Sequence, residues 1–362
     1  MAPPARAFPW QLPAGFPEPE VPQNNPMSAA KVRLGRHLFY DRRLSGTGHF
    51  SCASCHRQEL AFTDGRGRAI GATGARHPRS AMSLTNVAYN ATYNWADPSV
   101  TRLEEQALNP MLNRDPIELG IAGREVEVLE RLRSDGETVA MFEQAFPGET
   151  ISIDGITRAI AAFERTLISG NSPYDRYVFW GEQLEDAEAR GMELFFSERV
   201  RCSECHAGLN FSGPVRAVDS AITNLTAMAA KTDKPLSGEF QSEFHNTGLF
   251  DEDGAGAYPA PNRGVFEITN RAEDMGRFRA PTLRNIEVTA PYMHDGSLRT
   301  LEEVIGFYAE GGRGSGRSSP LKSKLVSGFA LDIQEQTDLV AFLKALTDRG
   351  FLTDPRFEDP GD

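Results

Sequence analysis

Apolar side chains recur at helical spacing in two stretches that lie far apart in the chain. Because an α-helix completes a turn every 3.6 residues, side chains three, four and seven positions apart share one face. Two sets follow this spacing with polar residues between them: Ile156, Ile160, Phe163 and Leu167, and then Leu339, Phe342, Leu343 and Leu346. The pattern predicts two amphipathic helices, each with one buried face.

A second pair of predicted helices shares a local sequence, Gly-x-x-Leu-Phe-aromatic. It occurs once in each half of the chain, as Gly35, Leu38, Phe39 and Tyr40 and as Gly191, Leu194, Phe195 and Phe196. Ser28 stands where a side chain can cap the first of these helices. The chain repeats one helical plan, which predicts an all-α fold of two similar halves.

Each of these short helices leads into a Cys-x-x-Cys-His motif. The two motifs contain all the cysteines of the chain: Cys52, Cys55 and His56, then Cys202, Cys205 and His206. In c-type cytochromes the two thiols form thioethers with haem and the histidine ligates its iron. A zinc site of four thiolates is the alternative, but it requires the distant pairs to converge and leaves both histidines unexplained. The motifs therefore predict two covalently attached c-type haems, with His56 and His206 as iron ligands.

A helix before the motif and an amphipathic helix that closes the unit is the plan of a small c-type cytochrome. We therefore predict two cytochrome c-like haem domains in tandem with long irregular loops, over residues 28–170 and 171–362. The segment 169–175 is rich in turn residues and is the expected linker.

Two further segments fall outside this minimal plan. Residues 1–27 hold eight prolines and are expected to form an extended arm on the body. Residues 207–270, rich in Gly, Pro, Asn and Asp, are expected to form a long irregular insertion over the second haem. Within it, residues 251–254 are expected to be an acidic turn rather than a calcium loop.

The composition excludes several classes of function. The chain has 362 residues with 38 Lys and Arg against 50 Asp and Glu, a formal charge of −12. This balance argues against binding to nucleic acid or to an anionic membrane surface. No apolar run approaches the ~18 residues of a membrane span. Since c-type haem is attached outside the cytoplasm, we expect a periplasmic protein, and we interpret the opening "MAPPARAFPW" as a mature chain without its export signal.

The sixth ligand of each iron decides between electron transfer and chemistry. For the second haem the residues downstream of the motif offer Met275, Met293, His294 and Tyr308, and their spacing does not choose among them.

Three stretches, 95–110, 276–297 and 300–312, resemble the bacterial dihaem cytochrome c peroxidase/MauG family, and the similarity covers nearly the whole chain. Segments 16–28 and 257–278 are most similar to the family's MbnH subgroup, the dihaem enzymes of methanobactin gene clusters. The resemblance implies that Tyr308 matches the position at which family peroxidases have a Met ligand and MauG has a Tyr. A phenolate at this position stabilises higher oxidation states of iron. The alternative is that Tyr308 is a buried helix aromatic; Met293 and His294 are expected to be core residues around the site.

For the first haem the resemblance implies an open, peroxide-reactive iron. Glu118 matches the family's distal acid–base glutamate, although its spacing from Pro110 is two residues longer, and Gln106 is its expected polar companion. The alternative for Glu118 is an exposed carboxylate. His77 lies in the loop after the first motif, which carries a distal histidine in some family peroxidases. Its position in that loop differs by several residues from theirs, so we expect His77 to be an exposed loop histidine.

The resemblance assigns two further sites. Trp95 matches a tryptophan that lies between the haems and relays electrons. A calcium ion between the domains would lie near Ser80, Ala280 and Thr282, but Ser80 stands where the family has an Asn ligand.

Together these implications describe a periplasmic dihaem oxidase that reacts with hydrogen peroxide, forms a bis-Fe(IV) state and oxidises a tryptophan on an MbnP-like partner protein. One alternative is a cytochrome c peroxidase that takes electrons from a small electron-transfer protein. The other is a non-enzymatic electron carrier, which requires two six-coordinate irons.

Overall fold

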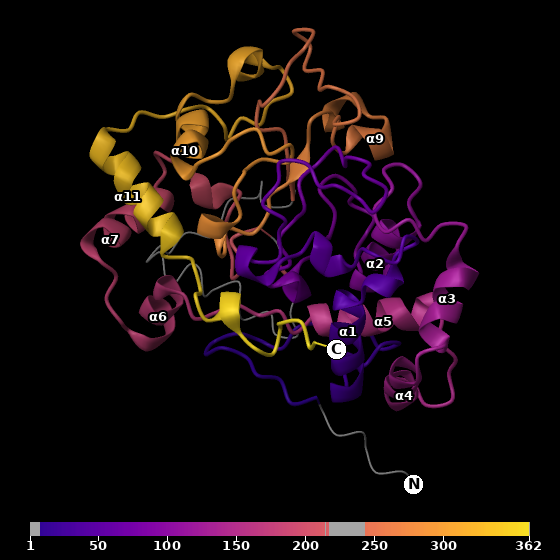
Figure 1. The fold of residues 1–362 in the computed structure, drawn as a ribbon. Helices are drawn as coiled ribbons and strands as arrows, with labels where there is room; N and C mark the ends of the chain where they lie inside the picture. The colour runs from indigo at the N-terminus through magenta and orange to yellow at the C-terminus, as the bar shows by residue number, and fades with distance from the viewer. Residues whose placement is uncertain (1–7, 214, 217–242, 362) are drawn as a thin grey trace.

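The computed structural model describes residues 8–213, 215–216 and 243–361. Helices joined by long irregular segments dominate this part of the chain (Figure 1). Strand β1 (Phe244–His245) pairs antiparallel with β2 (Phe278–Arg279). The helices are α1 (Ala29–Tyr40), α2 (Leu103–Leu112), α3 (Glu125–Arg133), α4 (Gly136–Ala145), α5 (Ile153–Glu164), α6 (Pro173–Trp180), α7 (Asp186–Phe195), α9 (Phe266–Thr269), α10 (Leu301–Ala309) and α11 (Ile333–Lys344).

The four helices predicted from the sequence are confirmed as α1, α5, α7 and α11. The Ser28 side chain accepts a hydrogen bond from the Lys31 N–H and caps α1, as expected. Leu167 and Leu346 lie beyond the ends of α5 and α11, because each helix stops earlier than the apolar pattern does, yet both side chains are fully buried.

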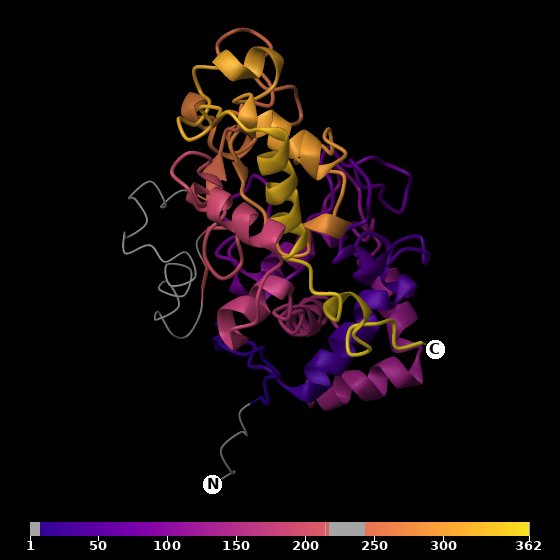
Figure 2. The ribbon, with the colours of Figure 1, turned by 90° about the vertical axis from the view of Figure 1, so that its left-hand side faces the viewer.

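Each half is built on one close helix–helix contact, α1 with α5 and α7 with α11. Figures 1 and 2 both show α7 next to α11. At the crossings Gly35 faces the Ala159 carbonyl and Gly191 faces the Asp338 carbonyl, so closely that a Cβ at either glycine would overlap the oxygen. The glycines in the repeated Gly-x-x-Leu-Phe sequence are therefore required for the two helices to approach.

Two large clusters of buried apolar side chains follow the two halves. The first contains Leu38, Phe39 and Phe163, and the second contains Phe195 and Phe342. The halves also exchange segments, because Phe351, Leu352 and Phe357 pack in the first cluster while Ala96 packs in the second. The end of the chain thus returns to α1, where the Tyr40 hydroxyl donates to the Phe357 carbonyl at 2.6 Å. The division into domains at residue 170 stays a prediction.

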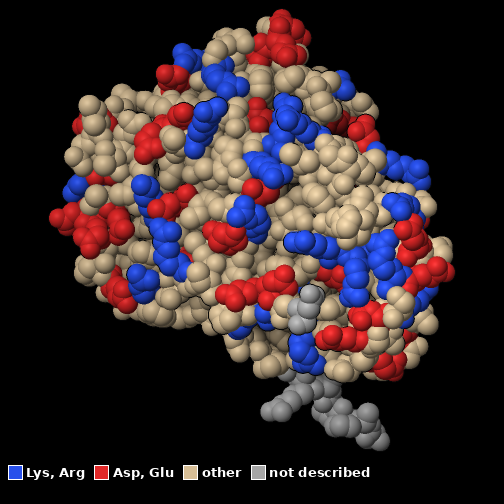
Figure 3. All heavy atoms as spheres, viewed as in Figure 1, with Lys and Arg blue, Asp and Glu red and all other residues tan. Residues whose placement is uncertain are grey.

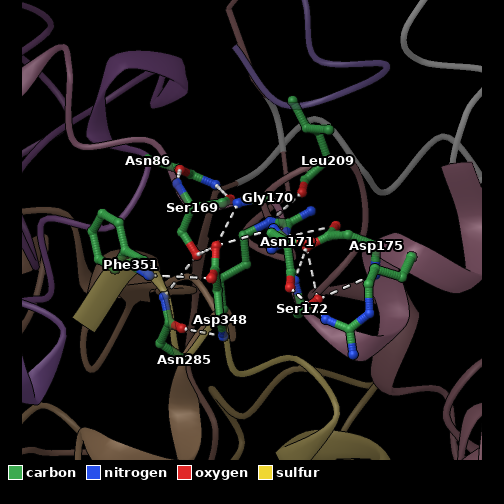
Figure 4. Close-up of polar contacts among 12 residues, drawn as sticks. Asn86, Ser169, Gly170, Asn171, Ser172, Asp175, Leu209, Asn285, Asp348 and Phe351 are labelled. Atoms are coloured by element: carbon green, nitrogen blue, oxygen red, sulfur yellow. Dashed lines mark hydrogen bonds and ion pairs between the residues drawn. The ribbon is translucent and has the colours of Figure 1, made fainter. Parts of the chain in front are cut away.

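Polar contacts bind the expected linker to the second half of the chain (Figure 4). Ser169 and Ser172 are fully buried. The Asp348 carboxylate accepts hydrogen bonds from the backbone N–H groups of Gly170 and Asn171, both at 3.0 Å. Turn residues are frequent here because their backbone groups and small side chains form hydrogen bonds with the second half. The sequence pattern does not reveal these hydrogen bonds.

A buried ion pair adjoins this junction. The Arg284 guanidinium donates to both carboxylate oxygens of Asp175 at 2.9 Å, and its Nε–H donates to the Leu209 carbonyl at 2.8 Å. Arg284 and Asp175 are each 2% exposed. These bonds connect three segments: α6, the loop after the second motif and the segment after β2.

The two irregular segments behave largely as expected. Residues 8–27 contain no helix, and Phe16 packs against Tyr89 with ring centroids 6.1 Å apart, while the extended arm over residues 1–27 stays a prediction. The insertion is irregular apart from β1 and the short α9 where it is described; residues 214 and 217–242 lie outside the described residues. Residues 251–254 form a turn, because Asp251 Oδ1 accepts from the N–H groups of Gly254 and Gly256, but the Asp251 side chain is buried rather than solvated.

The surface shows no separation of charge on the face drawn in Figure 3, where basic and acidic side chains are interspersed. Across the described residues, each helix is too short or too polar to cross a lipid bilayer.

Replacing Gly35 or Gly191 by alanine should destabilise the protein by about 1–3 kcal/mol, because the added methyl group forces a packed helix pair apart. The free energy of unfolding, measured by denaturant titration with circular dichroism, checks this. Gly136→Ala is the matched control: it begins α4 with no atom within 4 Å of the added Cβ, so it should be neutral or slightly stabilising. Equal stability of all three variants would contradict the close-contact argument.

Candidate active site around the two Cys-x-x-Cys-His motifs

Each motif folds into a short 3₁₀ turn, Cys52–Ser54 in the first half and Cys202–Glu204 in the second. The His56 N–H donates to the Cys52 carbonyl at 3.0 Å, and the second motif repeats this bond between His206 and Cys202. The turn therefore holds the two thiols and the histidine of a motif close together.

Both motif histidines are prepared as neutral metal ligands. Nδ1 of His56 lies 2.8 Å from the Phe62 carbonyl oxygen, and Nδ1 of His206 lies 3.0 Å from that of Phe211. A carbonyl oxygen only accepts, so Nδ1 carries the proton and Nε2 keeps its lone pair for a metal. Burial lowers the pKa of His56, and it lowers the pKa of His206 to about 4.

The four cysteines do not form a common zinc site. Cys52 packs against the first apolar cluster and Cys202 against the second. Within the described residues, which include every cysteine, no three His, Cys, Asp or Glu side chains are grouped as metal ligands. Paired thiols beside a free imidazole Nε2 instead fit a c-type haem at each motif.

The first motif opens into a cavity. Cys52, Cys55 and His56 line it, together with Gln106 from α2 and Glu118 from the loop that follows α2. The structure thus brings the predicted distal residues to the motif of the first half. Their catalytic roles stay predictions.

Backbone contacts place Glu118 at this cavity. Its carbonyl accepts from the Ala72 N–H at 2.7 Å, and the next residue, Leu119, donates to the Pro110 carbonyl at 2.8 Å. Gly71 permits this approach, since a Cβ there would overlap the Ile117 carbonyl. The half-buried carboxyl is not the exposed surface group of the alternative interpretation, and burial raises its pKa to about 7.

His77 was expected to be an exposed loop histidine, and this expectation is wrong. The ring lines the same cavity, with Nε2 4.0 Å from Glu118 Oε1. The loop turns inward because the His77 N–H donates to the Ala69 carbonyl at 2.8 Å and Nδ1 contacts the Arg79 backbone. Burial lowers the pKa of His77, so the ring is a neutral neighbour of the glutamate.

Trp95 joins the two halves. It belongs to the first half by sequence but packs against the second apolar cluster. Its indole N–H donates to the Ser80 carbonyl at 2.9 Å, and the Ser80 N–H donates to the His294 carbonyl at the same distance. Its own carbonyl accepts from the Arg279 N–H of β2 at 2.8 Å.

The residues expected near calcium make other contacts. The Ser80 hydroxyl donates to the Met293 carbonyl at 3.3 Å, and the Thr282 hydroxyl donates to the Asn210 carbonyl at 2.7 Å. The Ala280 N–H donates to the Glu243 carbonyl. The calcium ion stays a prediction.

Tyr308, on α10, lies at the second motif. Its ring packs against the second apolar cluster, and burial raises the pKa of its phenol. Cys205 and Cys202 also raise that pKa, so the phenol lies within electrostatic range of the second motif. Ligation of the second iron by Tyr308 stays a prediction.

The other ligand candidates lie in different surroundings. His294 is 5% exposed and stacks on Phe278 with ring centroids 3.6 Å apart, as expected of a core residue. Burial and nearby arginines lower its pKa to about 3, and Nε2 has no hydrogen-bond partner among the described residues. Met275 and Met293 are half-buried against the second cluster.

Two residues near the motifs were missed by the sequence reasoning. Glu164 ends α5 and lines the first cavity; its position four residues after Ile160, on the apolar face, was a signal that could have found it. His245 of β1 lowers the pKa of His206, so it lies near the second motif. No local pattern marks His245, because β1 is only two residues long.

Comparison with known proteins identifies the family. The family model for di-haem cytochrome c peroxidase (CCP_MauG) matches residues 29–183. A cytochrome-c peroxidase IdrP1 of Pseudomonas sp. (strain SCT) is 36% identical over 96% of this chain and 87% of its own length. The methylamine utilization protein MauG of Methylorubrum extorquens is 32% identical over 92% and 84%. The crystal structure of a MauG-like protein associated with microbial copper homeostasis superposes with a TM-score of 0.89 and 48% identity, covering 98% of this chain and 99% of that chain.

These relatives are haem oxidoreductases, and the match extends along nearly the whole chain. It agrees with the structure of this chain, in which each motif presents two cysteines and a histidine whose Nε2 is available to a metal. The chain belongs to the di-haem cytochrome c peroxidase/MauG family.

Proposed function

We propose that this chain is a periplasmic, peroxide-dependent dihaem oxidase of the MauG type that oxidises a tryptophan on a partner protein. Two c-type haems, when attached, supply the redox chemistry with hydrogen peroxide as oxidant. Similarity to a MauG-like protein associated with microbial copper homeostasis, and the resemblance to MbnH, support an MbnP-like partner.

The observation that carries the proposal is that Tyr308 and Cys202 of the second motif pack against the same apolar cluster, with the buried phenol in electrostatic range of the thiols. Burial keeps a phenol neutral, so ionisation at this position requires a positive charge opposite the oxygen, which a ferric iron supplies. A phenolate ligand then favours higher oxidation states, whereas a methionine favours ferrous haem. An oxidase that must hold oxidising equivalents for a partner protein needs the phenolate ligand.

In the first half, Glu118 is the proposed acid–base group. It accepts the proton of an incoming peroxide and returns one to the departing oxygen, with Gln106 as a hydrogen-bonding neighbour in the same cavity. Trp95 is the proposed electron relay, because its ring packs on the second half while its N–H holds the loop of the first.

A cytochrome c peroxidase that takes electrons from a small electron-transfer protein is the second candidate. The 36% identity to a protein of that name favours it. A non-enzymatic carrier is the third, and it requires a sixth ligand in the first cavity, where His77 is the nearby histidine. The ferric spectrum separates them: mixed high-spin and low-spin haem indicates an enzyme, and two low-spin haems indicate a carrier.

Peroxide treatment of the holoprotein mixed with the protein encoded beside it, followed by mass spectrometry, tests the function directly. Oxygen added at a partner tryptophan supports the oxidase. Peroxide consumption that needs a reduced cytochrome and leaves the partner unmodified supports the peroxidase.

Tyr308→His should keep the second haem six-coordinate and low-spin but reduce oxidation of the partner to near background, because neutral imidazole stabilises oxidised iron less than phenolate. Electron paramagnetic resonance and mass spectrometry of the partner check this. If Tyr308→Phe kept an unaltered low-spin spectrum and full partner oxidation, the tyrosine would be a packing residue and the ordinary peroxidase would be favoured.

Glu118→Gln should slow the reaction with peroxide by about 10²–10⁴-fold, the usual contribution of a positioned acid–base group. A carboxylate accepts a proton only above its pKa, and that pKa is about 7. The rate in the unmodified protein should therefore rise with pH through neutrality, and this step should be absent in the variant. Stopped-flow spectra at a series of pH values measure both, and an unchanged profile would remove Glu118 from the mechanism.

Trp95→Phe should leave both haems attached and ligated but should stop electron transfer between them. The low-spin ferric signal of the second haem should then persist after peroxide, whereas it should disappear in the unmodified protein. Trp180→Phe is the matched control, because that ring is 56% exposed on α6. Loss of the second haem's signal in Trp95→Phe would show that electrons pass by another route.

A further inference from the structure

The cavity of the first motif contains a carboxyl group that the proposed chemistry does not use. Glu164 is 5% exposed, and its Oε2 atom has no hydrogen-bond partner among the described residues. The side chain lines the cavity together with Cys52 and Glu118. A buried carboxylate without a partner is strongly unfavourable, so Glu164 is either neutral or balanced by positive charge in the cavity.

The charged groups around Glu164 are already engaged with one another. Arg165, the next residue, forms an ion pair with Glu104 of α2 at 2.9 Å. Glu104 also accepts from the Asn25 amide at 2.7 Å, and the Lys31 ammonium of α1 donates to the same amide side chain at 3.0 Å. Glu164 thus forms no ion pair of its own with the described residues of α1, α2 and α5, and Arg165 acts on it only as a nearby charge.

The position of Glu164 relative to the motif is also informative. After burial, Glu164 is the strongest influence on the pKa of the Cys52 thiol, ahead of Cys55 and Glu118. The carboxyl thus lies near the sulfur that forms a thioether. His56, His77 and Glu118 are the other titratable side chains that line this cavity outside the cysteines. A haem attached here brings its charge close to Glu164.

We propose, on the basis of the dihaem function, that Glu164 is a positioning residue that couples a proton to the electron of the first haem. When a haem held by Cys52, Cys55 and His56 receives one electron from a donor such as a small electron-transfer protein, the Glu164 carboxylate would take up one proton from solvent and become a carboxylic acid. Loss of the electron would return the proton to solvent. The coupling follows from Coulomb's law, because a ferric haem has one more positive charge than a ferrous haem and stabilises a nearby carboxylate more.

Burial supports the assignment, because it raises the pKa of Glu164 to about 8, with Arg165 acting to lower it and Glu104 to raise it. The charge of a ferric haem lowers this pKa, and the loss of that charge on reduction lets it rise again. At a pH between the pKa of Glu164 beside ferric haem and its pKa beside ferrous haem, reduction is accompanied by uptake of one proton.

The test is the midpoint potential of the first haem as a function of pH, measured on the holoprotein by spectroelectrochemistry at its high-spin bands. The potential of the unmodified protein should fall as pH rises, with a slope approaching the ~59 mV that corresponds to a tenfold change for one electron. Glu164→Gln should have a flatter profile and a higher potential at high pH. At low pH, where Glu164 is protonated in both redox states, the two proteins should converge.

Two variants provide controls. Glu164→Asp keeps a carboxyl group and should retain a pH-dependent potential. Glu105→Gln removes the same charge from an exposed position on α2 and should behave like the unmodified protein. Parallel profiles for Glu164→Gln and the unmodified protein would overturn the proposal.

Reduced-minus-oxidised infrared spectra give a second measurement. A carboxylic C=O band should appear on reduction, shift in Glu164→Asp and disappear in Glu164→Gln; an unshifted band in Glu164→Asp would overturn the proposal even if Glu164→Gln failed to fold. Neither measurement uses peroxide or a partner, so failure of the proposed oxidase function would be recognised separately.

Discussion

The buried ion pair between Arg284 and Asp175 is the contact on which the second half depends. A guanidinium that is 2% exposed is tolerated only when its hydrogen bonds are satisfied, and removal of one partner from such a pair typically costs about 3–5 kcal/mol. Besides Asp175, Arg284 holds the Leu209 carbonyl. Two residues later the Phe211 carbonyl fixes the tautomer of His206, with the Phe211 and Phe16 rings lying against the guanidinium at 5.8 and 5.1 Å. The pair therefore connects the junction between the halves to the orientation of a metal-binding imidazole.

The two halves use equivalent positions differently. Asn86 and Asn285 both have left-handed backbone, with φ of 57° and 60°, and their N–H groups donate to the carbonyls of Leu167 and Leu346 after α5 and α11. The residue before each asparagine differs, however: Thr85 in the first half and Arg284 in the second. The repeated framework thus carries different side chains at equivalent positions, and only the second half has a buried guanidinium at this one.

The sequence predicted those features that depend on local spacing. The Gly-x-x-Leu-Phe helices, the capping Ser28 and the Cys-x-x-Cys-His turns could be recognised because their residues lie within one or two turns of each other. The positions of His77 and His245 could not, since each depends on how distant backbone packs, whereas Glu164 was overlooked although its helical spacing from Ile160 marked it. His77, for instance, reaches the cavity through a loop bonded to Ala69 and Arg79, and a polar residue in a Gly-rich stretch is more often exposed. The buried junction at 169–175 was missed for a similar reason, because its partner Asp348 lies 178 positions from Gly170.

The two sites share a local fold but differ in their titratable groups and in the pKa values of those groups. The first cavity holds two carboxyl groups whose pKa values burial raises to about 7 and about 8, both close to neutral pH. Protons can therefore leave or enter there at little cost in free energy, which suits a site where peroxide exchanges protons. At the second motif, burial raises the pKa of the Tyr308 phenol well above its ordinary value, so an unligated phenol keeps its proton at neutral pH. Under the proposed ligation by Tyr308, the phenol gives up this proton once, when the haem is attached, and proton exchange during the reaction is confined to the first half.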